Sequence, residues 1–314
     1  MSRHRLVPLL VLIGLPLLLS ADPAARRGTV VPADLDRSPM SLGISPDGRF
    51  AATANATADS VSLVDLAAGR VIAEPVCGRR PIDVAWFDDS TLLVSLRDDD
   101  AVAVLDRTSA GLVRRATIPV GDSPHGLALV PVPGGRPRVF VALAGEDAVA
   151  ELDLAGRRVI RHFAAGGQPR WIAAAPNGRW LITCCNAPGE VLVHEIATGK
   201  LISRRTLFDD AFNLGVPVVL PDSSTLIIPH PINRSFPVSK QNVGRGWVID
   251  NRLTKLPLPE GKYWQQKQMN LDERGAGCGD VHALALSPDN RWLVATCGGS
   301  HELLIMRFGE LPWP

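Results

Sequence analysis

The stretch SLGISPDGRFAATANATADSVSLVDLAAGRVIAEP, residues 41–75, holds four short strand signals separated by turns. In its first part, Leu42 and Ile44 alternate with small residues, as side chains do when a strand points them to opposite faces. The Ser-Pro-Asp-Gly sequence at 45–48 predicts a turn, because proline presets φ, aspartate bonds its own backbone and glycine tolerates positive φ. Three further strand signals follow at 50–53, 61–65 and 71–73. Four short antiparallel strands in about 40 residues form a sheet that cannot bury both of its faces alone.

The same unit recurs along the chain. Its first strand and turn reappear at 83–90, 126–135, 171–178, 216–223 and 283–290. Its third strand reappears at 101–106, 148–153, 190–195, 246–251 and 302–307. The turn prolines Pro131, Pro176 and Pro221 follow one another at intervals of 45 residues. We therefore predict an all-β fold, a β-propeller of four-stranded antiparallel blades with six blades visible, and an irregular β-sandwich is the alternative.

The repeats and the N-terminus define the domain organisation. A short basic segment, an apolar run at 6–19 and the small residues Ser20 and Ala21 form the pattern of a signal peptide over 1–21. An uncleaved membrane anchor is the alternative, and either way the protein is expected to work outside the cytoplasm, in the periplasm or secreted. Residues 22–27 are interpreted as a linker, 28–308 as the propeller and 309–314 as a tail. The longer interval of 67 residues between Pro221 and Pro288 predicts insertions at 229–245 and 259–279.

The two ends of the propeller are expected to meet in one blade. The last blade supplies only three strand signals, whereas residues 29–31 form a lone strand signal ahead of the first blade. Pairing residues 29–31 beside 302–308 would complete the last sheet and remove an exposed edge. The alternative is an open ring that lacks a seventh blade.

Charge and cysteine content limit the classes of function. The 33 Lys and Arg residues balance 32 Asp and Glu residues, so nothing indicates nucleic acid, or a membrane beyond the leader, as a partner. Five cysteines are too few for a disulfide-built scaffold, but Cys278 and Cys297 fall near the same end of blade six and are the first pair to test for a disulfide. Adjacent Cys184 and Cys185 are expected to be small buried residues. The spacing from Cys278 to His282 is one residue too long for a CxxCH motif, so the chain carries no haem-attachment motif.

Several segments resemble a known repeat. The sequence VGDSPHGLALV at 120–130, followed by AVAELDL at 148–154, resembles the YVTN-type β-propeller repeat, as does SPMSLGISPDGRFAATAN at 38–55. The tetrapeptide that names the repeat is absent, and the fifth blade departs from the pattern. The resemblance implies an extracytoplasmic propeller that has seven blades in a full-length member. The segments 229–253 and 271–289 look like those of bacterial propellers that precede a dihaem cytochrome c peroxidase-like domain, which implies a downstream haem domain as a partner.

Blade geometry predicts where a site could form. Each blade begins about seven residues before its turn, and the residue after that start should face the channel mouth. In blade order these residues are Met40, Ile82, His125, Arg170, Gly215 and His282. The loops between second and third strands open on the same side and add His230 and His301.

The four histidines suggest a metal ion as cofactor. Imidazoles gathered at one rim can ligate a metal or transfer protons near neutral pH, so we predict His125, His230, His282 and His301 as metal ligands. The alternative is that these side chains only cap strands or line loops. His162 and His194 lie in outer strands and are interpreted as surface residues.

Other side chains on the same side suggest a binding surface. Arg170, Arg234 and Arg245 could hold an anionic group or a partner carboxylate, and Trp247 could form part of a docking surface. Neither a Ser/His/Asp order nor a pair of carboxylates specifies a reaction, so no catalytic residue is assigned. The favoured hypothesis is a non-enzymatic scaffold that docks a protein or haem domain on its elaborated blade-five and blade-six face. A lactonase-like or quinoprotein-like enzyme using the histidines is the alternative.

Overall fold

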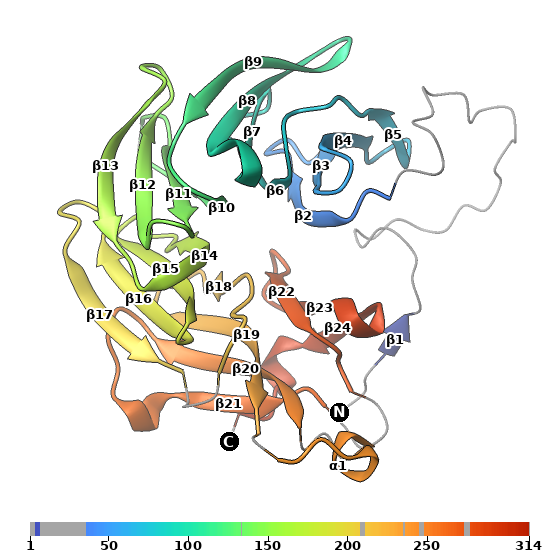
Figure 1. Ribbon diagram of the computed structural model, residues 1–314, viewed down its shortest axis with the longest axis vertical. Coiled ribbons are helices and arrows are strands. Elements are labelled where there is room, and N and C mark those ends of the chain that lie inside the picture. The colour runs from blue at the N-terminus through green and yellow to red at the C-terminus, as the bar shows by residue number, and fades with distance from the viewer. Residues whose placement is uncertain are drawn as a thin grey trace, which may run out of the picture. The chain divides into compact units, whose positions relative to one another are not determined.

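The computed structural model describes residues 4–6, 36–132, 134–207, 211–234, 236–244, 248–272 and 277–313. Within these ranges the chain forms six sheets of four strands, with very little helix (Figure 1). The predicted all-β propeller with six four-stranded antiparallel blades is therefore confirmed. The blades belong to two compact units, of which the smaller holds the first two and the larger holds the other four.

In the smaller unit, each sheet follows the chain order. Blade one contains β2 (Pro39–Ile44), β3 (Phe50–Asn55), β4 (Ser60–Asp65) and β5 (Arg70–Ala73). Blade two contains β6 (Pro81–Trp86), β7 (Thr91–Leu96), β8 (Ala101–Thr108) and β9 (Gly111–Pro119), with the 3-10 turn η2 (Arg97–Asp99). Alternate side chains of β3 and β7 pack in one shared core, because successive side chains of a strand point to opposite faces of its sheet.

The larger unit repeats the same order in blades three and four. Blade three contains β10 (Pro124–Val130), β11 (Arg138–Leu143), β12 (Ala148–Asp153) and β13 (Arg158–Ala164). Blade four contains β14 (Gly167–Ala174), β15 (Trp180–Ala187), β16 (Glu190–Glu195) and β17 (Leu201–Thr206). Phe140, Phe163 and Leu181 are among the buried side chains that join these two blades. Each such side chain contributes roughly 1.5–3 kcal/mol when fully buried.

Blade five differs from its sequence-based outline. It contains β18 (Val218–Val219), β19 (Thr225–Asn233), β20 (Ile249–Pro257) and β21 (Lys267–Asn270), with α1 (Lys240–Gly244) and η3 (Tyr263–Gln265). The predicted third strand at 246–251 was placed too early, because the long β19 pairs with β20 all the way from Asn233↔Ile249 to Thr225↔Pro257. The predicted insertion at 259–279 is partly wrong as well, since it contains β21, the fourth strand of the blade.

Blade six is completed by an N-terminal strand. It contains β22 (Val281–Leu286), β23 (Trp292–Cys297) and β24 (Glu302–Arg307), with η4 (Gly298–Ser300) and η5 (Phe308–Glu310). Its fourth strand is β1 (His4–Leu6), which pairs with β24 from His4↔Ile305 to Leu6↔Leu303. An N-terminal segment therefore pairs at the predicted edge, but it comes from the region interpreted as a leader. The predicted strand at 29–31 lies outside the described residues.

The described part of the chain contains no helix long and apolar enough to cross a membrane. Most of the leader, and the linker at 22–27, lie outside that part.

Candidate functional site

Every blade starts from the same backbone conformation. A residue with positive φ lies before the first strand in five blades and at the second position of β14 in blade four: Ser38, Arg80, Ser123, Gln168, Asn213 and Asp280. In three of the blade connections, an aspartate of the preceding blade accepts a hydrogen bond from this backbone N–H, as in Asp147 Oδ1 with Gln168 N at 2.9 Å. The residues expected at the channel mouth, two positions later, therefore occupy equivalent places in the blades of each unit.

In the larger unit, three rings from different blades meet at one place. Trp171 of β14 lies edge-to-face with His125 of β10, at 6.3 Å between ring centroids, and with His282 of β22, at 5.3 Å. His125 and Trp171 are buried, whereas His282 is half-buried. The structure thus brings two of the four predicted histidines to one aromatic side chain, and such edge contacts stabilise ring pairs beyond their buried area.

A chain of polar side chains runs beside these rings. Arg170 Nη1 donates to Asn213 Oδ1 at 3.4 Å, and Asn186 Nδ2 donates to the same oxygen at 3.4 Å. Asn213 Nδ2 in turn donates to Asp280 Oδ1 at 3.2 Å. Asn213 and Asp280 are themselves positive-φ residues that start blades five and six, so the backbone repeat places both ends of this chain. Arg170 was identified from the sequence, but Asn213 and Asp280 were not. Both stand two residues before the position expected at the channel mouth, so their place in the repeat could have indicated them.

The surroundings of His282 disfavour its protonated form. Burial lowers the pKa of its imidazole, Arg170 lowers it further and Asp280 opposes them. Its Nε2 atom is buried without a hydrogen-bond partner among the described residues. These features suit an imidazole that packs against Trp171.

The other two predicted ligands lie in different settings. His230 of β19 is fully buried within blade five, where its Nδ1 lies 3.2 Å from the carbonyl oxygen of Pro231 and its Nε2 lies 2.7 Å from Thr254 Oγ1. Burial lowers the pKa of His230 to about 4. His301 is exposed and ends η4 with a φ of 54°.

The structure does not assemble the predicted metal site. Among the residues it describes, no group of three or more His, Cys, Asp or Glu side chains could hold a metal ion. Both nitrogens of His230 are engaged inside its own sheet, so this side chain cannot also face the rings of His125 and His282.

Of the other predicted binding residues, the structure describes Arg170 and Arg234. Arg234 pairs with Asp250, and Arg252 donates to the same carboxylate at 2.8 Å, so Arg234 anchors the loop that leaves β19. Arg245 and Trp247 lie outside the described residues. His194, interpreted as a surface residue, is instead buried in blade four, where Nε2 donates to the carbonyl oxygen of Ala164 at 3.0 Å.

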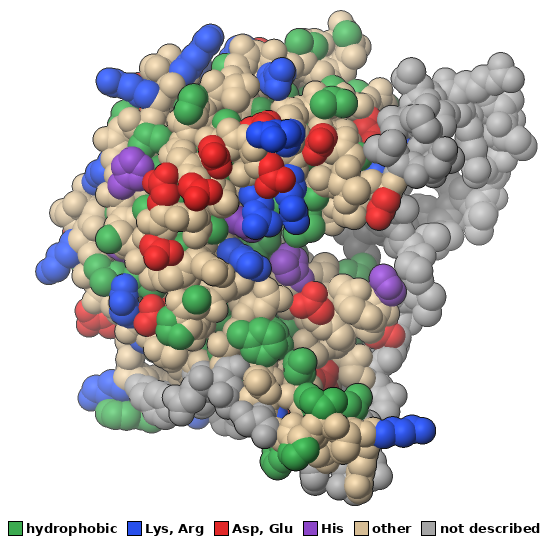
Figure 2. All heavy atoms as spheres, viewed as in Figure 1, with side chains coloured by type: hydrophobic (Ala, Val, Ile, Leu, Met, Phe, Trp, Pro, Cys, Tyr) green, Lys and Arg blue, Asp and Glu red, His purple; other side chains and the backbone are tan. Residues whose placement is uncertain are grey.

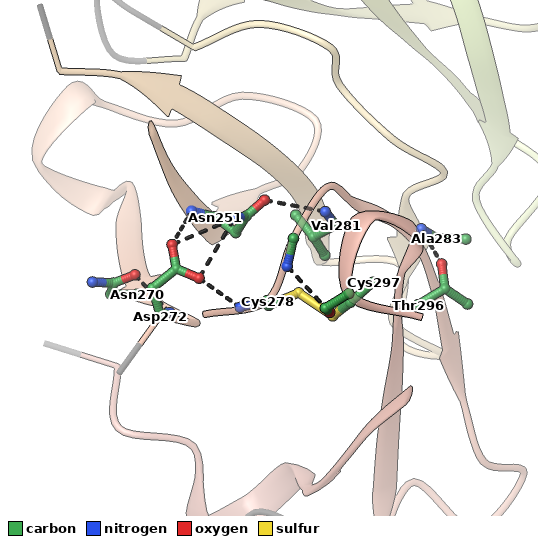
Figure 3. Close-up of a disulfide and its surroundings, with 10 residues drawn as sticks. Asn251, Asn270, Asp272, Cys278, Val281, Ala283, Thr296 and Cys297 are labelled. Atoms are coloured by element: carbon green, nitrogen blue, oxygen red, sulfur yellow. Dashed lines mark hydrogen bonds between the residues drawn. A yellow bond between two sulfur atoms is a disulfide. The ribbon is translucent and has the colours of Figure 1, made fainter. Parts of the chain in front are cut away.

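A disulfide braces the passage from blade five to blade six. Cys278 and Cys297, the pair that the sequence singled out for a first test, are bonded and almost fully buried (Figure 3). Asp272 accepts hydrogen bonds from the backbone N–H groups of Asn251 and Cys278, each at 2.7 Å, and Asn251 Oδ1 accepts one from Val281 at 3.1 Å. Burial raises the pKa of the Asp272 carboxyl. The segment around Cys278 is thus held by hydrogen bonds from backbone N–H groups as well as by the disulfide.

The long hairpin of blade five carries an exposed apolar surface. We define the apolar patch as five exposed side chains in and beside the loop between β19 and β20: Phe212, Phe236, Val238, Val243 and Ile249. Figure 2 shows hydrophobic side chains gathered around α1 at the lower right of the view. A pocket of about 530 Å³ opens here, and Phe212, Asn233, Val238 and Ile249 are among its lining residues. Sequence reasoning recognised the insertion but not this patch, because no periodicity distinguishes exposed from buried apolar residues in a loop.

Comparisons with known proteins agree with the fold. The WD40 domain, G-beta repeat, matches residues 271–303. The solved structure of hydrazine synthase from Kuenenia stuttgartiensis superposes with a TM-score of 0.80 at 24% identity, covering 90% of this chain and 80% of that chain. A Bacteroides uniformis protein described as a candidate 6-phosphogluconolactonase gives 0.64 at 16% identity, over 88% of this chain and 83% of its own.

Among curated proteins, the hydrazine synthase subunit beta of Kuenenia stuttgartiensis is 25% identical over 143 residues. That match spans 44% of this chain and 36% of the relative's length. A chain of the mitotic checkpoint complex is also similar in fold, with a TM-score of 0.61 at 16% identity over 85% of this chain and 73% of its own. The chain is a β-propeller repeat protein, similar to subunits of larger assemblies.

Proposed function

We propose that this chain is an extracytoplasmic, non-catalytic binding module that docks a protein partner on the elaborated side of blades five and six. The proposal rests on the distribution of exposed apolar side chains. In the described part of the larger unit, six of nine exposed large hydrophobic residues fall between Phe212 and Trp264. A concentrated apolar surface of this kind favours association, whereas single exposed side chains are ordinary.

The structure around the apolar patch supports a preformed docking surface. The nine-residue strands β19 and β20 hold the two ends of the loop, and Arg234 ties its start to Asp250. The disulfide and the Asn251–Asp272 hydrogen bonds hold the neighbouring passage into blade six. A surface that is ordered before binding loses less conformational entropy on association than a flexible one.

Relatives in multi-subunit assemblies support a protein as the partner. The similar proteins include a chain named as subunit beta of hydrazine synthase and a chain of the mitotic checkpoint complex. The resemblance of segments 229–253 and 271–289 to propellers that precede a dihaem domain makes a haem domain the favoured partner. Haem absorbance of the isolated complex would identify such a partner directly.

The extracytoplasmic assignment rests on two features. The N-terminus has the pattern of a signal peptide, and a buried disulfide is typical of proteins that fold in an oxidising compartment. Mass spectrometry of protein recovered from the periplasm or medium tests it: the expected mass lacks the leader, and blade six of that mature protein then keeps β22, β23 and β24 without β1. Intact protein confined to the cytoplasm would contradict the assignment.

Two matched isoleucines test the docking surface. Ile249 in the apolar patch is 50% exposed and Ile160 on the outer strand β13 is 52% exposed. In tagged protein purified from the source organism, we expect Ile249→Asp to lose the co-purifying partner and Ile160→Asp to retain it. Equal retention or equal loss in two folded variants would reject the blade-five surface.

A further inference from the structure

We propose that the edge of β24 in blade six accepts an extended apolar strand of the partner once the leader is removed. This inference rests on the proposed function, including cleavage of the leader, and adds the way in which the partner is held. It follows from three features of blade six: the loss of its fourth strand, the composition of β24 and the poor fit of β1.

Removal of the leader leaves blade six one strand short. In the described chain every strand belongs to one of six four-stranded sheets, and β1 is the fourth strand of blade six. The residues that follow β24 supply no replacement, because Phe308, Leu311 and Trp313 pack against the core of blades five and six. The described part of the mature chain thus holds no spare strand for this edge, and an uncovered edge presents unpaired backbone N–H and C=O groups.

The sequence of β24 is not that of a protected edge. The fourth strands of the other five blades all carry basic side chains, among them Arg70, Arg114, Arg158, Arg204 and Lys267. Charged side chains of this kind discourage further strands from adding to an edge. β24 instead has four consecutive apolar residues, 303–306, between Glu302 and Arg307. It is a third strand, and in the other five blades a fourth strand covers the third.

β1 shows how a strand fits this edge and where its own fit is poor. It pairs antiparallel with β24 over only three residues, which places the basic residue Arg5 opposite Leu304. Leu304 is 2% exposed and belongs to the core that blades five and six share. In blade five, by comparison, Met269 of β21 lies opposite Leu253, and both are buried in that core. A partner strand with an apolar residue opposite Leu304 would therefore fit better than β1.

Strand addition defines the chemistry of the partner segment. Backbone hydrogen bonds along the edge supply affinity, and alternate side chains supply specificity. The segment should be extended and rich in β-branched residues, which suit a strand. It should lack proline in its centre, because proline has no N–H to donate.

Two labelled peptides test the inference on the chain without its leader. One has seven residues of alternating valine and threonine, and the control has proline at the central position. We expect fluorescence anisotropy to show that the proline peptide binds about tenfold more weakly, because it loses hydrogen bonds. Hydrogen exchange should be fast in β24 of the free chain and should slow there, and not in β9, when the valine–threonine peptide binds.

The full chain supplies matched variants for the same test. With its leader present it should not bind the valine–threonine peptide, because β1 fills the edge. Arg5→Pro should restore binding, because proline disrupts that strand, whereas Arg5→Lys keeps the backbone N–H and should not. These variants also keep the inference testable if the leader-free chain fails to fold.

Several results would overturn the inference. Slow exchange of β24 in the leader-free chain alone would mean that this chain fills the edge, either with residues 29–31 or, if the protection grows with protein concentration, with a second copy. Equal binding of the two peptides, binding of neither, or an intact leader on the natural protein would also overturn it. Loss of the natural partner with Ile249→Asp in any of these cases would leave the proposed docking function standing, so the two failures are distinguishable.

Discussion

Blades four and five are alike in their buried second strands but differ in what extends beyond them. In both, the second strand is buried, as shown by Leu181 and Ile182 in β15 and by Leu226 and Ile227 in β19. In blade four, the turn from β15 to β16 needs only Pro188 and Gly189. In blade five, the corresponding loop runs from 234 to 248 and carries the apolar patch. The repeat therefore determines packing, and departures from it determine the surface available to partners.

The innermost strands differ for a steric reason. β14 has eight residues, whereas β18 has two. A Cβ at Gly215 would lie 1.9 Å from the carbonyl oxygen of His282, so the backbones of blades five and six meet directly there. Val216 then donates to that same oxygen at 2.7 Å and cannot pair within its own sheet.

Core truncation gives the largest expected difference between the two regions. Leu181→Ala in blade four should reduce the free energy of unfolding by about 2–5 kcal/mol, because it removes buried methyl groups and leaves a cavity. Ile249→Ala in the apolar patch should change it by less than about 0.5 kcal/mol, because the side chain is half exposed. Urea unfolding of both variants measures the contrast. Similar losses would mean that the patch belongs to the core.

Removing the disulfide should have the next largest effect. Cys278 and Cys297 are 19 positions apart, and closing a loop of this length stabilises a fold by about 3 kcal/mol in the chain-entropy model. The double variant Cys278→Ser/Cys297→Ser should therefore melt earlier than wild type. The free cysteines described in blade four, Cys184 and Cys185, offer no such effect. Reductant should lower the melting temperature of wild type and leave the double variant unchanged; a shift in both would assign the effect elsewhere.

Acid should destabilise both regions through one buried histidine each. Burial lowers the pKa of His194 in blade four, and lowers that of His230 in blade five from 6.5 to about 4. Between those two pH values the unfolded chain binds a proton at His230 that the folded chain excludes. The stabilisation is thus present above pH 6.5 and is lost as pH falls towards 4, by up to about 3 kcal/mol for His230.

The free energy of unfolding, measured by urea titration at several pH values, tests this contribution. His230→Gln should flatten the dependence between pH 6.5 and 4, and His194→Gln should flatten it by a separate amount. A substitution at His162, which is exposed on β13, is the control. An unchanged slope in His230→Gln would show that this imidazole does not contribute.

Much of the fold followed from local pattern, but only part of the candidate site did. The turn prolines and the blade starts placed His125, Arg170 and His282 correctly in the larger unit, because the backbone repeats where the sequence repeats. His230 and the third strand of blade five were misplaced, because β19 continues for nine residues and carries His230 into the sheet.

The sequence by itself determined the repeat and the four-stranded blades, since both depend on spacing along the chain. Only the tertiary structure decided which side chains those strands bury. His194 is enclosed although its strand lies towards the outside of the blade, whereas Val238 stays exposed although it is apolar. Burial depends on what packs against a residue from other parts of the chain, and local periodicity carries no information about that neighbour.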